Sequence, residues 1–327
     1  MSVHIPFSDI GQFRNCIKLV RERAEHSGIP LPTISFIGSV KLHGTNASIV
    51  FPENGEPYCQ SRSQIVTPEQ DNAGFAKWVD TWINKTPGVY GWLRHGFVVY
   101  GEWCGQGIQK GVAISQVPKN FIVFAVRLIE GENSNWALPP TVIEFAKGLG
   151  LKCIYNYPTW EISIDFNHPE EAQNRLVELT QAVENECPVG KAHGVSGVGE
   201  GIVWWPLRHP TFNVRDLEFK VKGEKHSESK VKTLAPVDVE KLATIKELVD
   251  SILTEHRLEK KLDSLKELGL QLELKNTGAY LKLVGQDVIK EEVDTIDASG
   301  LSRNEVMSEV NKRSKQFWVK NLEQIKE

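Results

Sequence analysis

The first candidate for chemistry is a lysine in residues 40–51, VKLHGTNASIVF. Lys41 ends one strand-like run, and a turn over residues 43–46 precedes the next run. A lysine becomes a nucleophile when neighbouring cations or a metal lower its pKa from the usual value of about 10.4. A solvated surface lysine beside a glycine turn has the same local pattern. This motif alone therefore leaves both roles open.

Other charged and aromatic residues accompany the later strand-like runs. They are, in chain order, Arg62, Glu102, Phe124, Glu200, Lys220 and Lys222. The last two are two residues apart, so they face the same side of a strand, where like charges are unfavourable unless an anion or solvent lies opposite. Taken singly, the glutamates could be strand-end carboxylates with ordinary partners, and Phe124 could be a core residue.

The order of these residues resembles the motifs of the covalent nucleotidyltransferases, which include polynucleotide ligases and RNA capping enzymes. Their K-x-D/H-G motif corresponds here to Lys41-Leu42-His43-Gly44. The finer resemblance is to the RNA ligase 2 family, the phage-type nick-sealing ligases with relatives among RNA-editing ligases. These proteins have histidine at the position of His43, where DNA ligases have aspartate. Further similar segments are residues 101–102 (GE), 107–110 (GIQK) and 225–228 (KHSE), so the resemblance covers residues 41 to about 228.

The resemblance implies an ATP-dependent RNA ligase that joins 3′-OH and 5′-phosphate RNA ends, in nick sealing or RNA repair. A lysine would attack the α-phosphorus of ATP to form lysyl–AMP, and AMP would then pass to the RNA 5′-phosphate to give an RNA-adenylate. Such phosphoryl transfers need positioning and charge neutralisation by cationic side chains and Mg²⁺ or Mn²⁺. The expected partner is RNA, most simply a nicked duplex, with repair or editing proteins as further partners and a monomeric chain.

The resemblance also implies roles for individual residues. Lys41 would be the nucleophile, and Glu200 would bind metal and help to activate it. Phe124 would stack on the adenine, and Glu102 would bind ribose or metal. The expected catalytic residues are Lys41, Glu200, Lys220 and Lys222; the expected nucleotide-binding residues are Val40, His43, Gly44, Asn46, Arg62, Glu102, Phe124, Lys220 and Lys222; the expected metal ligands are Glu200 and Glu102.

Some residues stay open between two roles. Four cations could follow the RNA backbone or could simply be solvated, namely Lys110, Lys119, Arg208 and Arg215. Trp204 and Trp205 could offer stacking surfaces, but strand alternation predicts that at least one of them is core. His193, in GKAHGVSG, is expected to be an exposed loop residue without a role.

The elements that must position these residues include both strands and helices. Apolar spacing predicts helices over 10–26, 69–85 and 168–186. Strands are predicted at TISFIGSV, ASIVF, FVVYGEW, FIVFAVRL, GIVWW and LEFKVK. Because regular helices do not separate these strands, the expected class is α+β. It comprises a nucleotidyltransferase domain with ATP-grasp-like antiparallel or mixed sheets and helices, followed by a small all-helical domain.

The expected boundaries are 1–223 for the adenylyltransferase domain, 224–237 for a polar linker, and 238–327 for the helical domain, which would grip RNA or dock a partner. A DNA ligase or capping guanylyltransferase usually has a strand-rich OB barrel after the catalytic domain, which the helical spacing disfavours. A non-catalytic RNA-binding relative would be expected to have lost the lysine or a glutamate.

Composition sets the outer limits. The chain has 327 residues and a formal net charge of −4, which suits about two soluble domains. No apolar run approaches the ~20 residues that span a bilayer. The first residues show neither a secretion signal nor a transit-peptide character. Five scattered cysteines argue against a disulfide framework or zinc ribbon, so the expected location is the cytoplasm.

Overall fold

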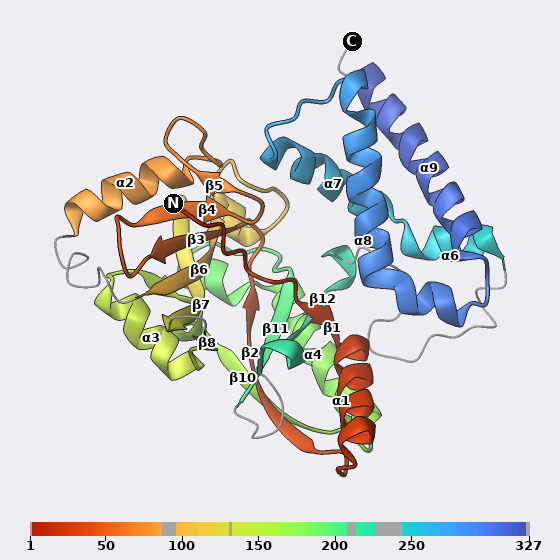
Figure 1. Cartoon of the computed structure of the whole chain (residues 1–327), viewed down its shortest axis with the longest axis horizontal. Helices are drawn as coiled ribbons and strands as arrows, with labels where there is room; N and C mark the ends of the chain where they lie inside the picture. The colour runs from red at the N-terminus through yellow and green to blue at the C-terminus, as the bar shows by residue number, and fades with distance from the viewer. Residues whose placement is uncertain (1, 87–95, 131–132, 208–213, 227–243, 325–327) are drawn as a thin grey trace. The chain divides into compact units, whose positions relative to one another are not determined.

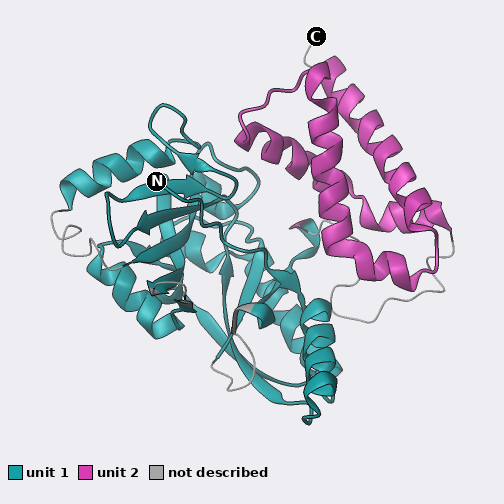
Figure 2. Ribbon diagram, in the orientation of Figure 1, with its two compact units in different colours: residues 1–225 teal, residues 226–327 magenta. Residues whose placement is uncertain are grey.

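The computed structural model describes residues 2–86, 96–130, 133–207, 214–226 and 244–324. It divides into two compact units, Met1–Lys225 (unit 1) and His226–Glu327 (unit 2), coloured separately in Figure 2. Of the predicted linker, residues 224–226 form a single 3-10 turn, and the rest lies outside the described residues.

Unit 1 contains two sheets (Figure 1). The first, sheet A, has the strand order β1 (Gly11–Gln12), β12 (Phe219–Lys222), β11 (Gly201–Pro206), β2 (Thr33–Lys41) and β10 (Thr159–Asp165). Its neighbours are antiparallel except β1 and β12, which run parallel. Strand β10 was not predicted, although Trp160, Ile162 and Ile164 alternate with polar residues as a strand with one buried face requires.

Sheet B contains seven strands. Its order is β5 (Ile65–Val66), β4 (Tyr58–Ser61), β3 (Thr45–Phe51), β6 (Phe97–Cys104), β7 (Asn120–Glu130) and β8 (Asn133–Trp136), with β9 (Lys152–Cys153) parallel to β7. The predicted α+β class with antiparallel and mixed sheets is therefore confirmed. A register shift at Tyr100 and Gly101 leaves Phe124 as an extra residue in β7. Such bulges are frequent beside functional sites.

The two faces of sheet B have different neighbours. Along β3, Ala47, Ile49 and Phe51 belong to a core shared with helices α2 (Phe75–Lys85) and α3 (Pro139–Gly148), which lie beside this sheet in Figure 1. The alternate residue Val50 packs instead with Trp205 of sheet A. One face of sheet B is thus covered by helices, and the other faces sheet A.

The three helices predicted in unit 1 begin later than expected, and α1 (Phe13–Ser27) begins at Phe13 instead of residue 10, because Gly11–Gln12 form β1. Helix α2 begins at Phe75 instead of residue 69, because the Asp71 carboxylate accepts hydrogen bonds from Ala76 N and Lys77 N and so caps the helix from outside it. A 3-10 turn over Pro169–Ala172 precedes α4 (Gln173–Asn185). The other helical segments of unit 1 are α5 (Pro188–Ala192) and short 3-10 turns at Ala113–Gln116, Ile154–Asn156 and Val214–Leu217.

The described part of unit 2 is entirely helical, as predicted. Its helices are α6 (Ile245–Ile252), α7 (Glu255–Glu267), α8 (Thr277–Ala298) and α9 (Arg303–Gln324), with a 3-10 turn at Leu274–Asn276. They enclose a core that includes Leu248, Leu258, Val284 and Trp318. None of the helices in the described ranges of either unit is both long and apolar enough to cross a membrane.

Candidate active site

The predicted nucleophile lies at the end of a central strand, beside a buried carboxylate. Lys41 is the last residue of β2, and Gly201, the first residue of β11, is directly opposite it. This register brings the Lys41 ammonium Nζ to 2.7 Å from Glu200 Oε2. The Glu200 side chain is only 2% exposed, whereas that of Lys41 keeps 20%. The carboxylate is therefore buried, whereas the lysine side chain remains accessible to solvent.

Two further side chains share the same carboxylate. Lys222 Nζ lies 3.6 Å from Glu200 Oε1, and His43 Nδ1 lies 3.2 Å from Oε2. Gly201 makes this arrangement possible: its φ is +150°, and a Cβ there would lie 2.2 Å from the Val221 carbonyl oxygen. Only glycine lets β12 approach β11 so closely at this point.

The turn after Lys41 is pressed against sheet B. A Cβ at Gly44 would lie 2.4 Å from the Trp103 carbonyl oxygen. The Glu102 carboxylate Oε1 accepts a 2.8 Å hydrogen bond from Gly44 N, and Asn46 is the cross-strand partner of Glu102. Glu102 thus orients the turn that follows Lys41.

Strand register places most of the predicted residues on facing sides of the two sheets. On sheet A, Lys41 shares a face with Ile37. Across β11, Lys222 is level with Lys41 and Lys220 is level with Ser39, so these lysines lie on the same face. Ile37 packs into the core between the sheets. On sheet B, Asn46 and Glu102 continue the face of Val50 and Tyr100, which line the same core. The candidate site therefore lies next to that core, on the same facing sides of the two sheets, where the side chains become polar.

Three predicted residues have other surroundings. Arg62 is paired with Asp9 and its side chain is 55% exposed, so no contact in the described residues joins it to the Glu200 cluster. Phe124 is half-buried and packs edge-on against Phe7, with 4.9 Å between ring centres. The Val40 side chain is buried, which leaves its backbone as the part that a nucleotide could contact.

Of the four basic residues suggested for an RNA track, the structure describes the side chains of Lys110 and Lys119. Lys119 Nζ donates a 2.7 Å hydrogen bond to the Ala73 carbonyl, next to the start of α2, and Lys110 is solvent-exposed. Arg208 and the side chain of Arg215 lie outside the described residues. Asp9, the partner of Arg62, was missed because a pairing across 53 residues has no local sequence signal.

The donors around Lys41 fit a divalent cation that takes most of its ligands from phosphate and water. In the described parts of the chain, no group of three or more His, Cys, Asp or Glu residues forms a metal cage. Mg²⁺ typically uses one or two protein carboxylates together with substrate phosphates. Glu200 and Glu102 can provide such carboxylates.

Comparisons with known proteins give one family match and several similar solved structures. A family model described as RNA ligase matches residues 34–222, more than half of the chain and the span from β2 to β12. Among solved structures, the Naegleria gruberi RNA ligase with PPi is 17% identical, with a TM-score of 0.46. Two point mutants of that ligase, one with AMP and Mn and one with ATP and Mn, are 17% and 18% identical, each with a TM-score of 0.47. In each case the match covers 68% of this chain and 57% of the other. No match is found among curated proteins.

Proposed function

This chain belongs to the RNA ligase family, and we propose that it is an ATP-dependent RNA ligase that joins a 3′-OH to a 5′-phosphate through a lysyl–AMP intermediate. The observation that supports this most directly is the contact of Lys41 with a buried glutamate and, through it, with Lys222. A solvated surface lysine would need no such partner.

Lys41 acts first in the proposed reaction. Its amine attacks the α-phosphorus of ATP, an N–P bond forms, and pyrophosphate leaves with the electrons of the broken P–O bond. The amine must lose a proton, and Glu200 Oε2, at 2.7 Å, is the nearest acceptor. Lys220, Lys222 and Arg62 would neutralise the phosphate oxygens.

The later steps use the same centre. An RNA 5′-phosphate oxygen attacks the phosphorus of lysyl–AMP and releases Lys41, and a 3′-hydroxyl then attacks the RNA-adenylate and releases AMP. Glu102 and His43 hold the turn that contains Gly44, close to the ribose and phosphate, and Asn46 lines the same face. The half-buried ring of Phe124 would stack on the adenine.

We propose ATP and Mg²⁺ or Mn²⁺ as the co-substrate and metal, as in the ligase structures with ATP and Mn. Glu200 and Glu102 would hold the cation, which would supply charge neutralisation at the phosphates. Nicked duplex RNA is the proposed substrate.

Unit 2 would bind RNA or a partner protein and would not take part in lysyl–AMP formation. A chain truncated at residue 235 should therefore still form lysyl–AMP and lose sealing activity. Loss of lysyl–AMP formation in a folded truncated chain would contradict this division of roles.

A label-transfer assay tests the proposal. The purified protein is incubated with Mg²⁺ and α-labelled ATP or α-labelled GTP, denatured, and resolved on a gel. We expect label from ATP only, abolished by Lys41→Ala and retained by Lys147→Ala, a matched exposed lysine on α3. Label from GTP would instead indicate a capping enzyme. Absence of label from folded, AMP-free protein would favour a non-catalytic RNA-binding relative.

The nucleic acid is identified with a second assay. Nicked duplexes are prepared with RNA or DNA strands on each side of the nick. Sealing of RNA nicks supports the proposal, whereas sealing of DNA alone would contradict it.

A further inference from the structure

A second polar cluster lies near the proposed active site. Tyr157 Oη is 3.0 Å from His193 Nε2, and Lys152 Nζ is 3.4 Å from the same nitrogen. An ammonium group can only donate a hydrogen bond, so His193 Nε2 can accept from Lys152 only when the imidazole is neutral with its proton on Nδ1. Partial burial and the charge of Lys152 lower the pKa of His193, which agrees with this protonation state.

The cluster has a positive charge without an opposing carboxylate. Among the described residues, no Asp or Glu pairs with Lys152 or His193. The nearby Cys104 thiol does not supply the missing charge, because burial raises its pKa. The Lys152 ammonium has further N–H donors besides the one toward His193, and the Tyr157 hydroxyl can rotate its single proton from His193 Nε2 to an anion, so the two groups suit an anion.

Strand register places the cluster beside Lys41. Lys152 on β9 is opposite Ile122, and Ile122 is opposite Glu102, so Lys152 lies on the face of Glu102, about 10 Å away across two strand spacings. Tyr157 precedes β10 by two residues, and Thr159 pairs with Ser39 of β2. The cluster therefore lies on the β10 side of the end of β2, whereas Glu200 and Lys222 lie on its β11 side.

The position favours phosphate over a nucleobase. Phe124, the proposed stacking residue, is two residues beyond Ile122 toward the apolar core and packs with Phe7. Lys152 is level with Glu102, where ribose and phosphate groups are proposed. The nucleotide already has Lys41, Lys222 and Lys220 for its own phosphates.

We propose that Lys152 and Tyr157 bind a phosphate group of the RNA strand beside Lys41, with His193 as the residue that positions them. This inference rests on the proposed function, because it assigns a site to the polynucleotide substrate of the same reaction. The phosphate is either the terminal 5′-phosphate that receives AMP or an internal phosphodiester next to it.

The test measures RNA binding in a Lys41→Ala background, where no covalent step occurs. Fluorescence anisotropy gives the affinity for a nicked RNA duplex with a 5′-phosphate at the nick and for the same duplex with a 5′-hydroxyl. Loss of one hydrogen bond to a charged group corresponds to about tenfold or more in Kd. If the terminal phosphate is bound, Lys152→Gln and Tyr157→Phe should weaken the 5′-phosphate duplex by that factor and leave the 5′-hydroxyl duplex unchanged. Equal weakening of both duplexes would assign the internal phosphodiester.

The matched control is Lys147→Gln, an exposed lysine of the same unit, which should bind both duplexes like the parent. For His193, a Gln substitution retains an acceptor at the ring nitrogen's position and should preserve binding, whereas His193→Leu should lose it. Parent-like binding by both Lys152→Gln and Tyr157→Phe would overturn the proposal.

The two proposals fail separately. If the wild-type chain forms no lysyl–AMP, the ligase function fails while the binding measurement still decides the phosphate site. If lysyl–AMP formation is slowed by Lys152→Gln while RNA binding is unchanged, the cluster serves the nucleotide and the RNA inference is wrong.

Discussion

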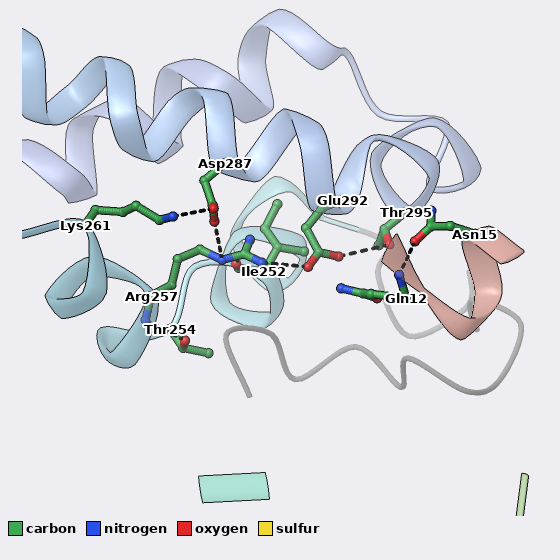
Figure 3. Close-up of polar contacts among 9 residues, drawn as sticks. All are labelled: Gln12, Asn15, Ile252, Thr254, Arg257, Lys261, Asp287, Glu292 and Thr295. Carbon is green, nitrogen blue, oxygen red and sulfur yellow. Dashed lines mark hydrogen bonds and ion pairs between the residues drawn. The ribbon is translucent and has the colours of Figure 1, made fainter. Parts of the chain in front are cut away.

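Each unit contains a buried glutamate that pairs with cations, and the two sets of cations differ in their exposure. Glu200 in unit 1 contacts Lys41 and Lys222, whose side chains keep 20% and 10% exposure. Glu292 in unit 2 is fully buried and pairs at 2.9 Å with Arg257, which is 1% exposed. Figure 3 shows that Arg257 also contacts Asp287 and the Ile252 carbonyl, and that Thr295 donates to Glu292.

This difference in exposure distinguishes cations that can take part in a reaction from a cation that only stabilises the fold. Arg257 is charged at every relevant pH and is fixed by several hydrogen bonds, so it can hold two helices together but has no access to substrate. Lysines on flexible stems at the open side of a buried carboxylate can exchange that carboxylate for a phosphate. Burial of the acid is common to both sites, and accessibility of the base distinguishes them.

The largest effect is expected from breaking the closed network. Arg257→Met removes the buried cation that lies 2.9 Å from the buried Glu292 carboxylate, which should cost about 3–5 kcal/mol in the free energy of unfolding. Urea denaturation followed by circular dichroism measures this loss. Lysyl–AMP formation by the folded fraction should stay at the wild-type rate, and a lower rate there would contradict the assignment of a purely structural role.

Cysteine reactivity shows which unit has unfolded. All five cysteines are buried and lie in unit 1. Burial raises the pKa of Cys16 and Cys59 to about 12 and that of Cys153 to about 11, so at pH 8 these thiols are neutral in the folded unit. Arg257→Met should therefore unfold unit 2 at a urea concentration where iodoacetamide still does not label the chain.

A slightly smaller effect is expected from the open cluster. Glu200→Gln keeps the shape of the side chain but removes the charge that faces Lys41 and Lys222. The rate of lysyl–AMP formation should fall by about 10²–10³-fold, the usual loss for one preorganised electrostatic group at a reacting centre. Single-turnover label transfer measures the rate. Glu292→Gln is the matched variant, and an equal loss of rate there would remove the distinction between the two glutamates.

Replacing both charges of the closed pair should restore most of the stability. Arg257→Met combined with Glu292→Leu removes both charges of that pair, and Asp287 keeps its ion pair with Lys261. Apolar replacements of buried ion pairs are often neutral, so unfolding free energy within about 1 kcal/mol of wild type is expected. A double variant as unstable as Arg257→Met alone would show that the geometry of the ion pair itself is required.

The smallest effect is expected at an exposed ion pair of the same unit. Arg303 lies 2.6 Å from Asp297, and both side chains are at least half exposed. Because solvent screens such pairs, Arg303→Ala should change the free energy of unfolding by less than about 0.5 kcal/mol. A change as large as that of Arg257→Met would mean that burial is not what separates these arginines.

Much of the fold followed from periodicity. The strands that hold Lys41, Glu102 and Lys222 are apolar runs bounded by turns, and each was predicted in place. At Trp204 and Trp205, alternation required at least one core residue. Both are buried, because sheet A is covered on both faces there. That second burial depends on the layer opposite and has no signal in a single strand.

The sequence by itself determined the order of the motif residues, the class of fold and the helical character of unit 2, because hydrophobic spacing and turn residues act locally. Only the tertiary structure decided which residues meet. Glu200 meets Lys41 through the β11–β2 register, Arg62 pairs with Asp9, and His193, a loop residue without a predicted role, contacts Lys152 and Tyr157. These contacts join residues 36 to 159 positions apart, and no local periodicity encodes the strand pairing that brings them together.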